Sequence, residues 1–259
     1  MLSRVAFALT ALAPALLLAG CGSSNDTAAD SATATSNTAG TSAPATSAPP
    51  TGKATCSYPS DGQGSAGIKV TAPPTTPTVS GDVKATMKTS IGAIGLTLDA
   101  KSAPCTVNSF VSLAKQGYFN KTSCHRLTTA GIYVLQCGDP SGSGSGGPGY
   151  SFADELDGTK PFAEDKAAEK QYEQQTGQKQ EVKTYPTGTV AMANAGANTN
   201  GSQFFLVYAD SPLPPAYTVF GTIDAAGVKA ITTAAKAGTD NGTDGHPKTA
   251  VDITSVTIG

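Results

Sequence analysis

Apolar and polar residues alternate in short runs from residue 83 onward, and turn-forming residues separate the runs. Residues 83–89 and 91–98 both alternate and are divided by a short break, which predicts a hairpin. Further short apolar or aromatic runs predict strands at residues 125–127, 133–136, 189–193, 203–207, 219–221 and 251–258. The pattern therefore predicts a mainly β domain.

Two segments with helical spacing interrupt these runs. Pro104 stands where the first helix begins, and Gly117 follows as its stop. Residues spaced three and four apart form its apolar face: Val107, Phe110, Val111 and Ala114. Residues 225–236 predict a second helix. Many short strands with two helices are typical of a closed antiparallel barrel that helices cap.

A polar stretch at residues 155–186 interrupts the strand pattern. Its residues 164–175 are charged and amide-rich helix formers. We expect a helical insertion on the surface of the domain. A role in docking a partner is an open alternative for it.

The N-terminus differs from this globular pattern. Residues 1–20 carry one positive charge followed by an apolar run that is too short for a comfortable membrane span but typical of a signal peptide. The run ends in Leu-Ala-Gly-Cys, which resembles a bacterial lipobox and predicts lipidation of Cys21. The alternative is ordinary secretory cleavage with Cys21 incidental. Lipidation would place the protein on the outer face of the cell membrane, held by its acyl chains.

Two further segments precede the alternating region. Residues 21–55 are rich in Ser, Thr, Ala and Pro with almost no large apolar side chain, which predicts a disordered stalk. Residues 56–82 contain many Pro and Gly and predict an extended lead-in, in which only residues 68–70 look strand-like. The globular domain is then expected at residues 83–259.

Composition excludes some functions. The 259 residues carry 17 Lys and Arg against 19 Asp and Glu, a net charge of -2, so no basic surface for nucleic acid is expected. The glycine-rich run at residues 142–149 lacks the Lys-Ser/Thr of a phosphate loop and predicts a flexible loop. His246 lies in a turn and is expected to be exposed, whereas His125 is interpreted as a packing residue that orients its neighbour.

Several motifs in one order resemble the cyclophilin family of peptidyl-prolyl cis-trans isomerases. They are Cys-His-Arg at 124–126, Tyr-Val-Leu-Gln-Cys-Gly-Asp at 133–139, MANAGANTNGSQFF at 192–205, Leu213, and Tyr-Thr-Val-Phe-Gly at 217–221. The resemblance extends over about residues 83–258 and is greatest to lipid-anchored extracytoplasmic cyclophilins of high-GC Gram-positive bacteria. It implies an eight-stranded barrel with a helix at each end and a groove on its outer face.

The resemblance also assigns roles to residues. It implies a catalytic arginine at Arg126, a substrate-positioning carboxamide at Gln136, and a contact of Asn194 with the substrate backbone. It implies that the substrate site includes Tyr133, Val134, Ala193, Ala195, Gln203, Phe205, Leu213 and Tyr217. The substrates would be proline-containing peptide segments, and neither a cofactor nor a metal ion is implied.

The chain departs from the family pattern at several positions. Tyr133, Val134, Pro212 and Tyr217 replace the Phe, Met, Trp and His that members commonly have, and two extra residues lie between His125 and Gln136. The pocket would remain apolar. A binding module without turnover is therefore kept as the alternative to an isomerase.

Four cysteines follow Cys21, and an even number in an oxidising compartment is consistent with two disulfides in any of three pairings. If the strands that hold Cys124 and Cys137 are antiparallel neighbours, these two cysteines could face each other. Cys56 would then join the lead-in to Cys105 at the first helix.

Overall fold

The computed structural model describes residues 54–259 apart from 63, 66 and 67. The predicted signal peptide, Cys21 and most of the predicted stalk lie outside the described residues. Ten strands form one sheet: β1 (Asp82–Thr89), β2 (Gly92–Asp99), β3 (Thr122–Ser123), β4 (Arg126–Thr128), β5 (Val134–Cys137), β7 (Thr189–Met192), β8 (Phe204–Val207), β10 (Val219–Ile223), β11 (Asp244–Gly245) and β12 (Asp252–Ile258).

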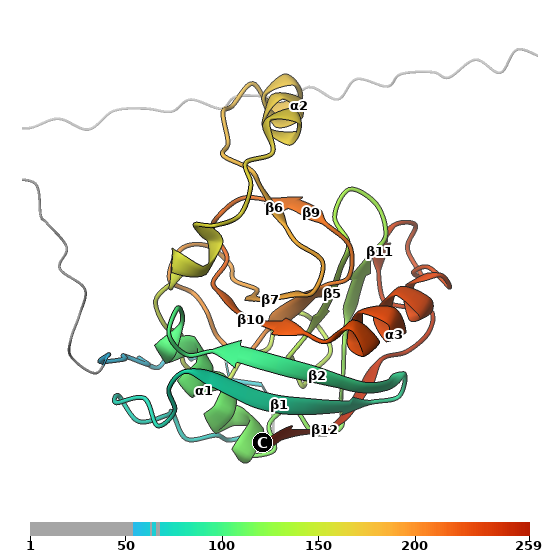
Figure 1. Ribbon diagram of the computed structural model, residues 1–259. Coiled ribbons are helices and arrows are strands. Elements are labelled where there is room, and N and C mark those ends of the chain that lie inside the picture. Colours follow the sequence, from blue (N-terminus) through green and yellow to red (C-terminus); the bar gives the residue numbers. More distant parts are fainter. Residues whose placement is uncertain (1–53, 63, 66–67) are drawn as a thin grey trace, which may run out of the picture. The chain divides into compact units, whose positions relative to one another are not determined.

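This sheet is antiparallel and curls around a central core (Figure 1). Its strand order is β11-β4-β5-β8-β7-β10-β2-β1-β12-β3. The eight predicted strands are all present, and the two additional strands, β3 and β11, contain two residues each. Only Cys124 and His125 separate β3 from β4 along the chain, so one continuous segment pairs with β12 on one side and with β5 on the other. The predicted mainly β fold is confirmed, as a curled antiparallel half-barrel of ten strands rather than a closed barrel of eight.

A smaller sheet, which the sequence pattern did not reveal, lies beside the barrel. It pairs β6 (Lys183–Tyr185) with β9 (Ser211–Leu213). Each strand has three residues, and β9 contains Pro212, which cannot donate a backbone hydrogen bond. Such short runs carry too little periodicity to be recognised.

Two helices lie on different sides of the barrel, α1 (Pro104–Lys115) and α3 (Ala225–Ala235), as predicted (Figure 1). Pro104 occupies the first turn of α1, and Gly117 adopts a left-handed conformation with φ of 72° just after the helix. The Ala103 side chain cannot cap α1. Glu155 does so instead, because its carboxylate accepts hydrogen bonds from the backbone N–H groups of Cys105 and Thr106 at 3.0 and 2.8 Å.

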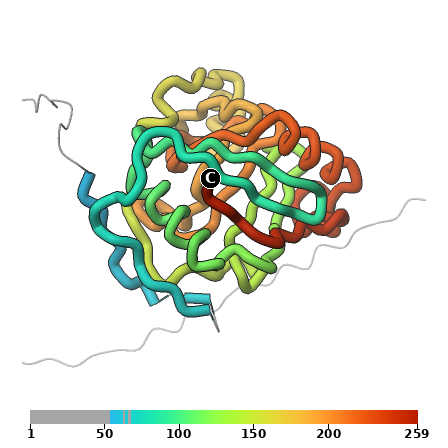
Figure 2. Tube along the Cα trace, turned by 60° about the horizontal axis from the view of Figure 1, so that its bottom comes forward, coloured from blue at the N-terminus to red at the C-terminus, as the bar shows by residue number. Residues whose placement is uncertain are grey.

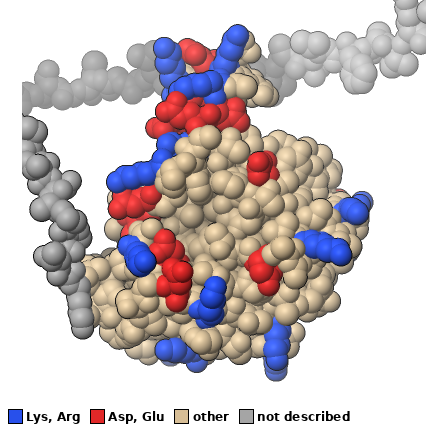
Figure 3. Space-filling view, in the orientation of Figure 1, with Lys and Arg blue, Asp and Glu red and all other residues tan. Residues whose placement is uncertain are grey.

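The predicted insertion contains a short 3-10 turn, η1 (Leu156–Thr159), and helix α2 (Lys166–Thr176). None of the residues of α2 is buried, and its ribbon stands away from the barrel (Figure 1). Asp165 caps its N-terminus and Gly177 ends it with φ of 72°. Figure 3 shows charged side chains of both signs crowded on this insertion. The polar sequence is therefore that of a solvent-exposed helix.

The lead-in forms neither helix nor strand in its described residues before Asp82, so the strand expected at residues 68–70 is absent. It follows the side of the barrel that carries α1 (Figure 2). Part of its backbone bonds to side chains of α1 and its C-cap: Thr71 N–H donates to Gln116 Oε1 at 2.8 Å, and Thr78 N–H to Asn108 Oδ1 at 3.0 Å. Earlier in the lead-in, the N–H groups of Asp61 and Ser65 donate to the carbonyls of Gly149 and Gly147 at 3.2 and 2.8 Å. These contacts, and several prolines, explain the extended path.

Both disulfides match the pairing that the sequence suggested. Cys56 is bonded to Cys105, which fastens the lead-in to the start of α1. Cys124, just before β4, is bonded to Cys137, the last residue of β5. Each cross-link limits the conformations of the unfolded chain and so favours the folded state.

No helix in the described part of the chain is long and apolar enough to cross a membrane. The short apolar run at residues 5–18 is outside that part.

Candidate active site

Strand register places the candidate residues in one row on the outer face of the barrel. Arg126 on β4 lies opposite Gln136 on β5, which lies opposite Phe205 on β8, which in turn lies opposite Ala191 on β7. Because side chains alternate between the two faces of a strand, the adjacent row points inward. That inner row is Leu127, Leu135, Leu206 and Val190, all at most 1% exposed. Arg126 and Gln136 are thereby held beside Phe205 by a rigid core.

Three residues of the outer row, Arg126, Gln136 and Phe205, line a pocket of 200 Å³. Its apolar surface comes from Phe205, Val134 and Leu213, which are 5%, 3% and 8% exposed. Ile132, Ala193 and Tyr217 complete that surface, and the ring of Tyr217 meets the Phe205 ring edge to face at 5.4 Å. The polar lining groups are Arg126, Gln136 and Asn194. A small apolar ring can enter here with a cation at its edge.

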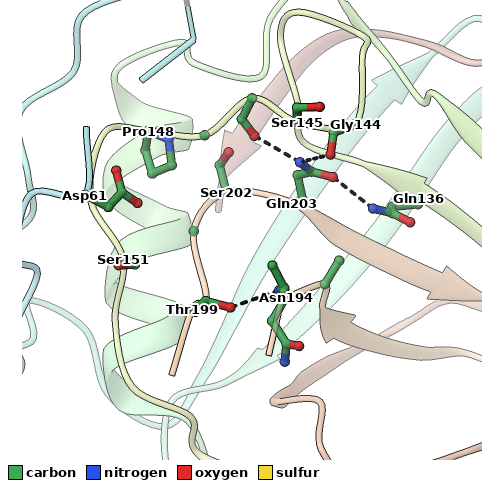
Figure 4. Close-up of a pocket in the computed structure, with 15 residues that line it drawn as sticks. Asp61, Gln136, Gly144, Ser145, Pro148, Ser151, Asn194, Thr199, Ser202 and Gln203 are labelled. Carbon is green, nitrogen blue, oxygen red and sulfur yellow. Dashed lines mark hydrogen bonds between the residues drawn. The ribbon is translucent and has the colours of Figure 1, made fainter. Parts of the chain in front are cut away.

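A chain of hydrogen bonds leads away from Arg126. Arg126 Nη1 donates to Gln136 Oε1 at 3.3 Å. Gln136 Nε2 in turn donates to Gln203 Oε1 at 2.8 Å (Figure 4). Gln203 Nε2 then donates to the backbone carbonyls of Gly144 and Gly146, both at 2.9 Å. The two carboxamides are thus fixed in orientation, and the glycine-rich loop holds the far end of the chain.

Asp139 holds the glycine-rich loop from the protein interior. Its carboxylate is fully buried and accepts backbone N–H groups from Ser141, Gly144 and Gly146 at 2.7–3.0 Å, besides the Ser141 hydroxyl. Burial by itself raises the pKa of Asp139, but the hydrogen bonds outweigh it and lower the pKa from 3.8 to about 2. The loop predicted to be flexible is therefore organised around a buried anion.

The guanidinium of Arg126 is also held from its other side. Nε and Nη2 donate to the two carboxylate oxygens of Asp244, both at 2.7 Å. These bonds raise the pKa of Arg126 and lower the pKa of Asp244, so the pair stays ionised at neutral pH. A guanidinium has five N–H donors and three are engaged by described residues, which leaves two for a ligand.

Asn194 is fixed by contacts within the protein. Its Nδ2 donates to the carbonyl of Ala216 at 2.9 Å, and its Oδ1 accepts from Gly196 N–H at 3.2 Å. These two bonds fix the orientation of the carboxamide at the edge of the pocket.

A comparison with protein families gives a match over residues 84–258, more than half of the chain, to the model described as cyclophilin type peptidyl-prolyl cis-trans isomerase/CLD. The chain belongs to the cyclophilin family. The match begins after the lead-in, so the cyclophilin domain proper starts with β1.

Curated relatives include two mycobacterial proteins. The chain is 50% identical over 208 residues to the probable peptidyl-prolyl cis-trans isomerase B of Mycobacterium tuberculosis, an overlap of 79% of this chain and 64% of that protein. It is 49% identical over 208 residues to the Mycobacterium leprae protein of the same name, with 78% and 66% covered. The chain thus spans about two thirds of the length of these relatives.

Solved structures agree with the fold. A cyclophilin type peptidyl-prolyl cis-trans isomerase from Cryptosporidium parvum is 26% identical, covers 69% of this chain and 98% of its own, and gives a TM-score of 0.52. The same protein, crystallised in the presence of the dipeptide Ala-Pro, is 27% identical, covers 68% and 98%, and gives a TM-score of 0.51.

The structure brings most of the predicted cyclophilin site residues together. Those that line the pocket are Arg126, Val134, Gln136, Ala193, Asn194, Phe205, Leu213 and Tyr217. Gln203 and Ala195 line an adjoining hollow. Tyr133 does neither: it packs against the main core, with its ring 5.9 Å from that of Tyr208.

The misplacement of Tyr133 has a simple cause. Side chains alternate in β5, so Val134 and Gln136 face the pocket while Tyr133 faces inward. Ile132, two residues before Val134, takes the pocket position. The two-residue period of a strand, followed back from Gln136 through Val134, would have identified Ile132 as the pocket residue. The two extra residues in the preceding loop obscured that register.

Two carboxylates of the site were missed altogether. Asp244 lies 118 residues after Arg126 and reaches it because β11 pairs with β4. Asp139 is the last residue of the motif at 133–139, but no local signal showed that it would be buried. Both depend on tertiary contacts that a single sequence does not reveal.

The histidines behave as expected. His246 is exposed, whereas His125 is buried at 7% exposure beneath Gly144 of the glycine-rich loop. Burial lowers the pKa of His125, although the nearby Asp139 carboxylate acts in the opposite direction. The ring is accordingly neutral at neutral pH and packs beside Arg126.

Proposed function

We propose that this chain is a peptidyl-prolyl cis-trans isomerase, which accelerates rotation about X-Pro bonds in peptide segments. The observation that carries the proposal is the oriented guanidinium of Arg126 at the edge of an apolar pocket of 200 Å³. Family membership supports it. So does the related Cryptosporidium parvum structure, whose title names a proline dipeptide.

The chemistry of the reaction suits this set of residues. Rotation about an X-Pro bond must overcome a barrier of roughly 18–20 kcal/mol because the amide is stabilised by resonance. No covalent bond is broken, so neither a nucleophile nor a metal ion is needed. The enzyme has only to bind the twisted amide more tightly than the planar one.

Arg126 can supply that difference. In the twisted state the prolyl nitrogen becomes pyramidal and regains a lone pair, which can accept one of the two remaining guanidinium N–H groups. This hydrogen bond does not exist in the planar ground state, so it lowers the barrier itself. Each tenfold increase in rate requires the activation free energy to fall by about 1.4 kcal/mol, which a charge-assisted hydrogen bond can provide.

The other residues restrict the motion to one bond. Phe205, Leu213 and Val134 would hold the proline ring, and Asn194 would hold the flanking peptide. Asp244 and Gln136 keep the guanidinium aimed at the pocket, so little reorganisation is required during rotation.

The first test is turnover. Residues 54–259 should raise the cis-trans exchange rate of X-Pro peptides, measured by NMR exchange spectroscopy, by orders of magnitude at micromolar enzyme. The alternative, a cyclophilin-like module that binds proline segments without turnover, predicts chemical-shift changes on binding with no increase in exchange. That result would contradict the proposal.

We also propose that the protein is anchored by lipid at Cys21 on the extracytoplasmic face of the cell membrane, where it assists folding of secreted or surface proteins. The signal-like segment supports this, and so do the two disulfides, which persist in oxidising compartments. We expect Cys21→Ala to move the full-length protein from the membrane fraction to the soluble fraction. Immunoblots of fractionated cells measure this distribution. An unchanged distribution, or an unmodified Cys21 by mass spectrometry, contradicts the anchor.

A further inference from the structure

The apolar wall of the proline pocket belongs to a small hydrophobic cluster of its own, apart from the main core. Its buried members among the described residues are Val134, Tyr185, Ala191, Phe205, Val207, Leu213 and Val219, and the half-buried residues packed against them are Ile132, Phe162, Ala193 and Tyr217. Three residues of each group line the pocket. The shape of the pocket therefore depends on what fills the rest of this pocket cluster.

Tyr185, at the end of β6, has the largest side chain among the buried members of the pocket cluster. It is fully buried and is not among the described residues that line the pocket. Its ring centroid lies 6.4 Å from the centroids of both Phe205 and Tyr217. Tyr185 thus lies behind the two aromatic residues of the pocket wall and occupies the space into which their rings could otherwise move.

The hydroxyl of Tyr185 holds another part of the wall. It donates a hydrogen bond to the carbonyl of Pro214, directly after Leu213, at 3.0 Å. Burial raises the pKa of Tyr185, so the hydroxyl stays protonated and remains a donor at neutral pH. Strand pairing acts in the same place, because β6 lies beside β9 with Lys183 opposite Leu213. Tyr185 therefore supports the aromatic and the aliphatic parts of the wall together.

The base of the insertion holds Tyr185 from its other side. The Phe162 ring meets the Tyr185 ring edge to face, with 5.1 Å between centroids. The two ends of the insertion are joined where Thr184 N–H donates to the carbonyl of Ala163 at 2.9 Å. The small sheet of β6 and β9 lies between α2 and the barrel (Figure 1). The Tyr185 ring is thus enclosed between the insertion and the pocket wall.

We propose that Tyr185 is a positioning residue of the isomerase, which holds Phe205 and Tyr217 at the spacing that fits a five-membered ring. The inference rests on the proposed isomerase function and names what sets the size of its proline pocket. Because protein interiors are close-packed, a ring with one more methylene can enter only if the wall moves back, and the Tyr185 ring prevents that movement. The insertion thereby contributes to substrate selection through its base, although Tyr185 does not touch the substrate.

The test compares two peptides that differ by one methylene group. One contains proline, and the other contains pipecolic acid, whose ring has six members, at the same position. Exchange spectroscopy gives kcat/KM for each. For the unmodified protein we expect kcat/KM to be about tenfold higher, or more, for the proline peptide, the usual effect of one methylene in an apolar pocket. Equal values for the two rings overturn the proposal.

Variants of Tyr185 assign this ring-size preference. Tyr185→Leu removes the ring behind the wall, so the preference should fall to about threefold or less as the wall gains room to move. KM for the proline peptide should rise with little change in kcat, since Arg126 is held independently by Asp244 and Gln136. Tyr185→Phe keeps the ring and loses only the bond to Pro214, and should restore the preference.

Tyr150→Leu is the matched control. Tyr150 is a buried tyrosine of the main core, and its hydroxyl oxygen lies 2.8 Å from that of Ser109 on α1. The same substitution there should lower the thermal stability and keep the full ring-size preference. An equal loss of preference in Tyr150→Leu, or an unchanged preference in folded Tyr185→Leu, overturns the proposal.

A second variant decides the question if Tyr185→Leu does not fold. Phe162→Ala removes the half-buried ring that supports Tyr185 from the insertion. It should reduce the ring-size preference in the same direction, whereas an unchanged preference in this variant counts against the proposal.

The dissociation constants of the two peptides, measured by NMR titration, separate this inference from the proposed function. If neither peptide is turned over, the isomerase proposal fails, whereas tighter binding of the proline peptide that Tyr185→Leu abolishes still supports the positioning role. Turnover with the same ring-size preference in Tyr185→Leu leaves the isomerase proposal intact and overturns the role of Tyr185.

Discussion

Replacement of Arg126 by alanine should lower kcat/KM for an X-Pro peptide by roughly 10²-fold or more, with little change in peptide affinity. That is the usual effect of removing one donor that acts mainly in the transition state. The proline pocket does not depend on this side chain, because its apolar wall is built from Phe205, Val134 and Leu213. Exchange spectroscopy gives the rate, and titration of the same peptide gives the dissociation constant.

Loss of fold would be a poor explanation of such a result. The Arg126 and Asp244 side chains are 41% and 51% exposed, so breaking their ion pair should change the free energy of unfolding by at most about 1 kcal/mol. Arg126→Lys is the matched control, since it keeps the charge but cannot reproduce the paired bonds to Asp244 and Gln136. We expect it to recover only part of the rate. Undiminished exchange in Arg126→Ala would remove the basis of the proposed mechanism.

The strands and helices could be predicted because their residues repeat with a clear period. The hairpin β1–β2 alternates over eight residues in each strand, and α1 carries its apolar residues at spacings of three and four. β6 and β9 could not, since three residues, one of them Pro212, carry no usable period. Residues 68–70 looked like a strand, but Ile68 N–H bonds to the carbonyl of Ser65 within the lead-in and the next residue, Thr71, bonds to the side chain of Gln116 just after α1.

The site residues also fall into those that a local sequence pattern predicts and those that only the fold brings together. Arg126, Gln136 and Phe205 were identified because the cyclophilin-like motifs contain them, and the strand register then explains why they are neighbours. Asp244 reaches Arg126 from a segment far away in sequence, through β11, and Asp139 holds the glycine-rich loop from a buried position. Their roles depend on which segments the fold brings together, and no local pattern encodes that.

Replacement of Asp139 by alanine should have the largest effect on stability among the site residues. It removes the acceptor of the loop N–H groups of Ser141, Gly144 and Gly146, and we expect unfolding to become easier by about 3 kcal/mol. Activity should fall as well, because the carbonyls of Gly144 and Gly146 hold Gln203, which orients Gln136 beside Arg126. Urea denaturation and exchange spectroscopy measure the two losses.

The pH dependence of the free energy of unfolding separates the contribution of the Asp139 charge from that of the size and shape of its side chain. Asp139→Asn is the matched variant, because it keeps the shape and lacks the charge. The folded pKa is about 2 against an ordinary value of 3.8, so the folded protein binds this proton less readily than the unfolded chain does. The resulting stabilisation, about 2 kcal/mol, is fully present above pH 3.8 and is lost as the pH falls through about 2. Asp139→Asn lacks that contribution at every pH. Its deficit relative to the unmodified protein should therefore be largest near pH 6 and should shrink by that amount towards pH 2. A deficit that stays constant over this range would show that the carboxylate is not preferentially ionised in the folded state, and that the loop is held by shape alone.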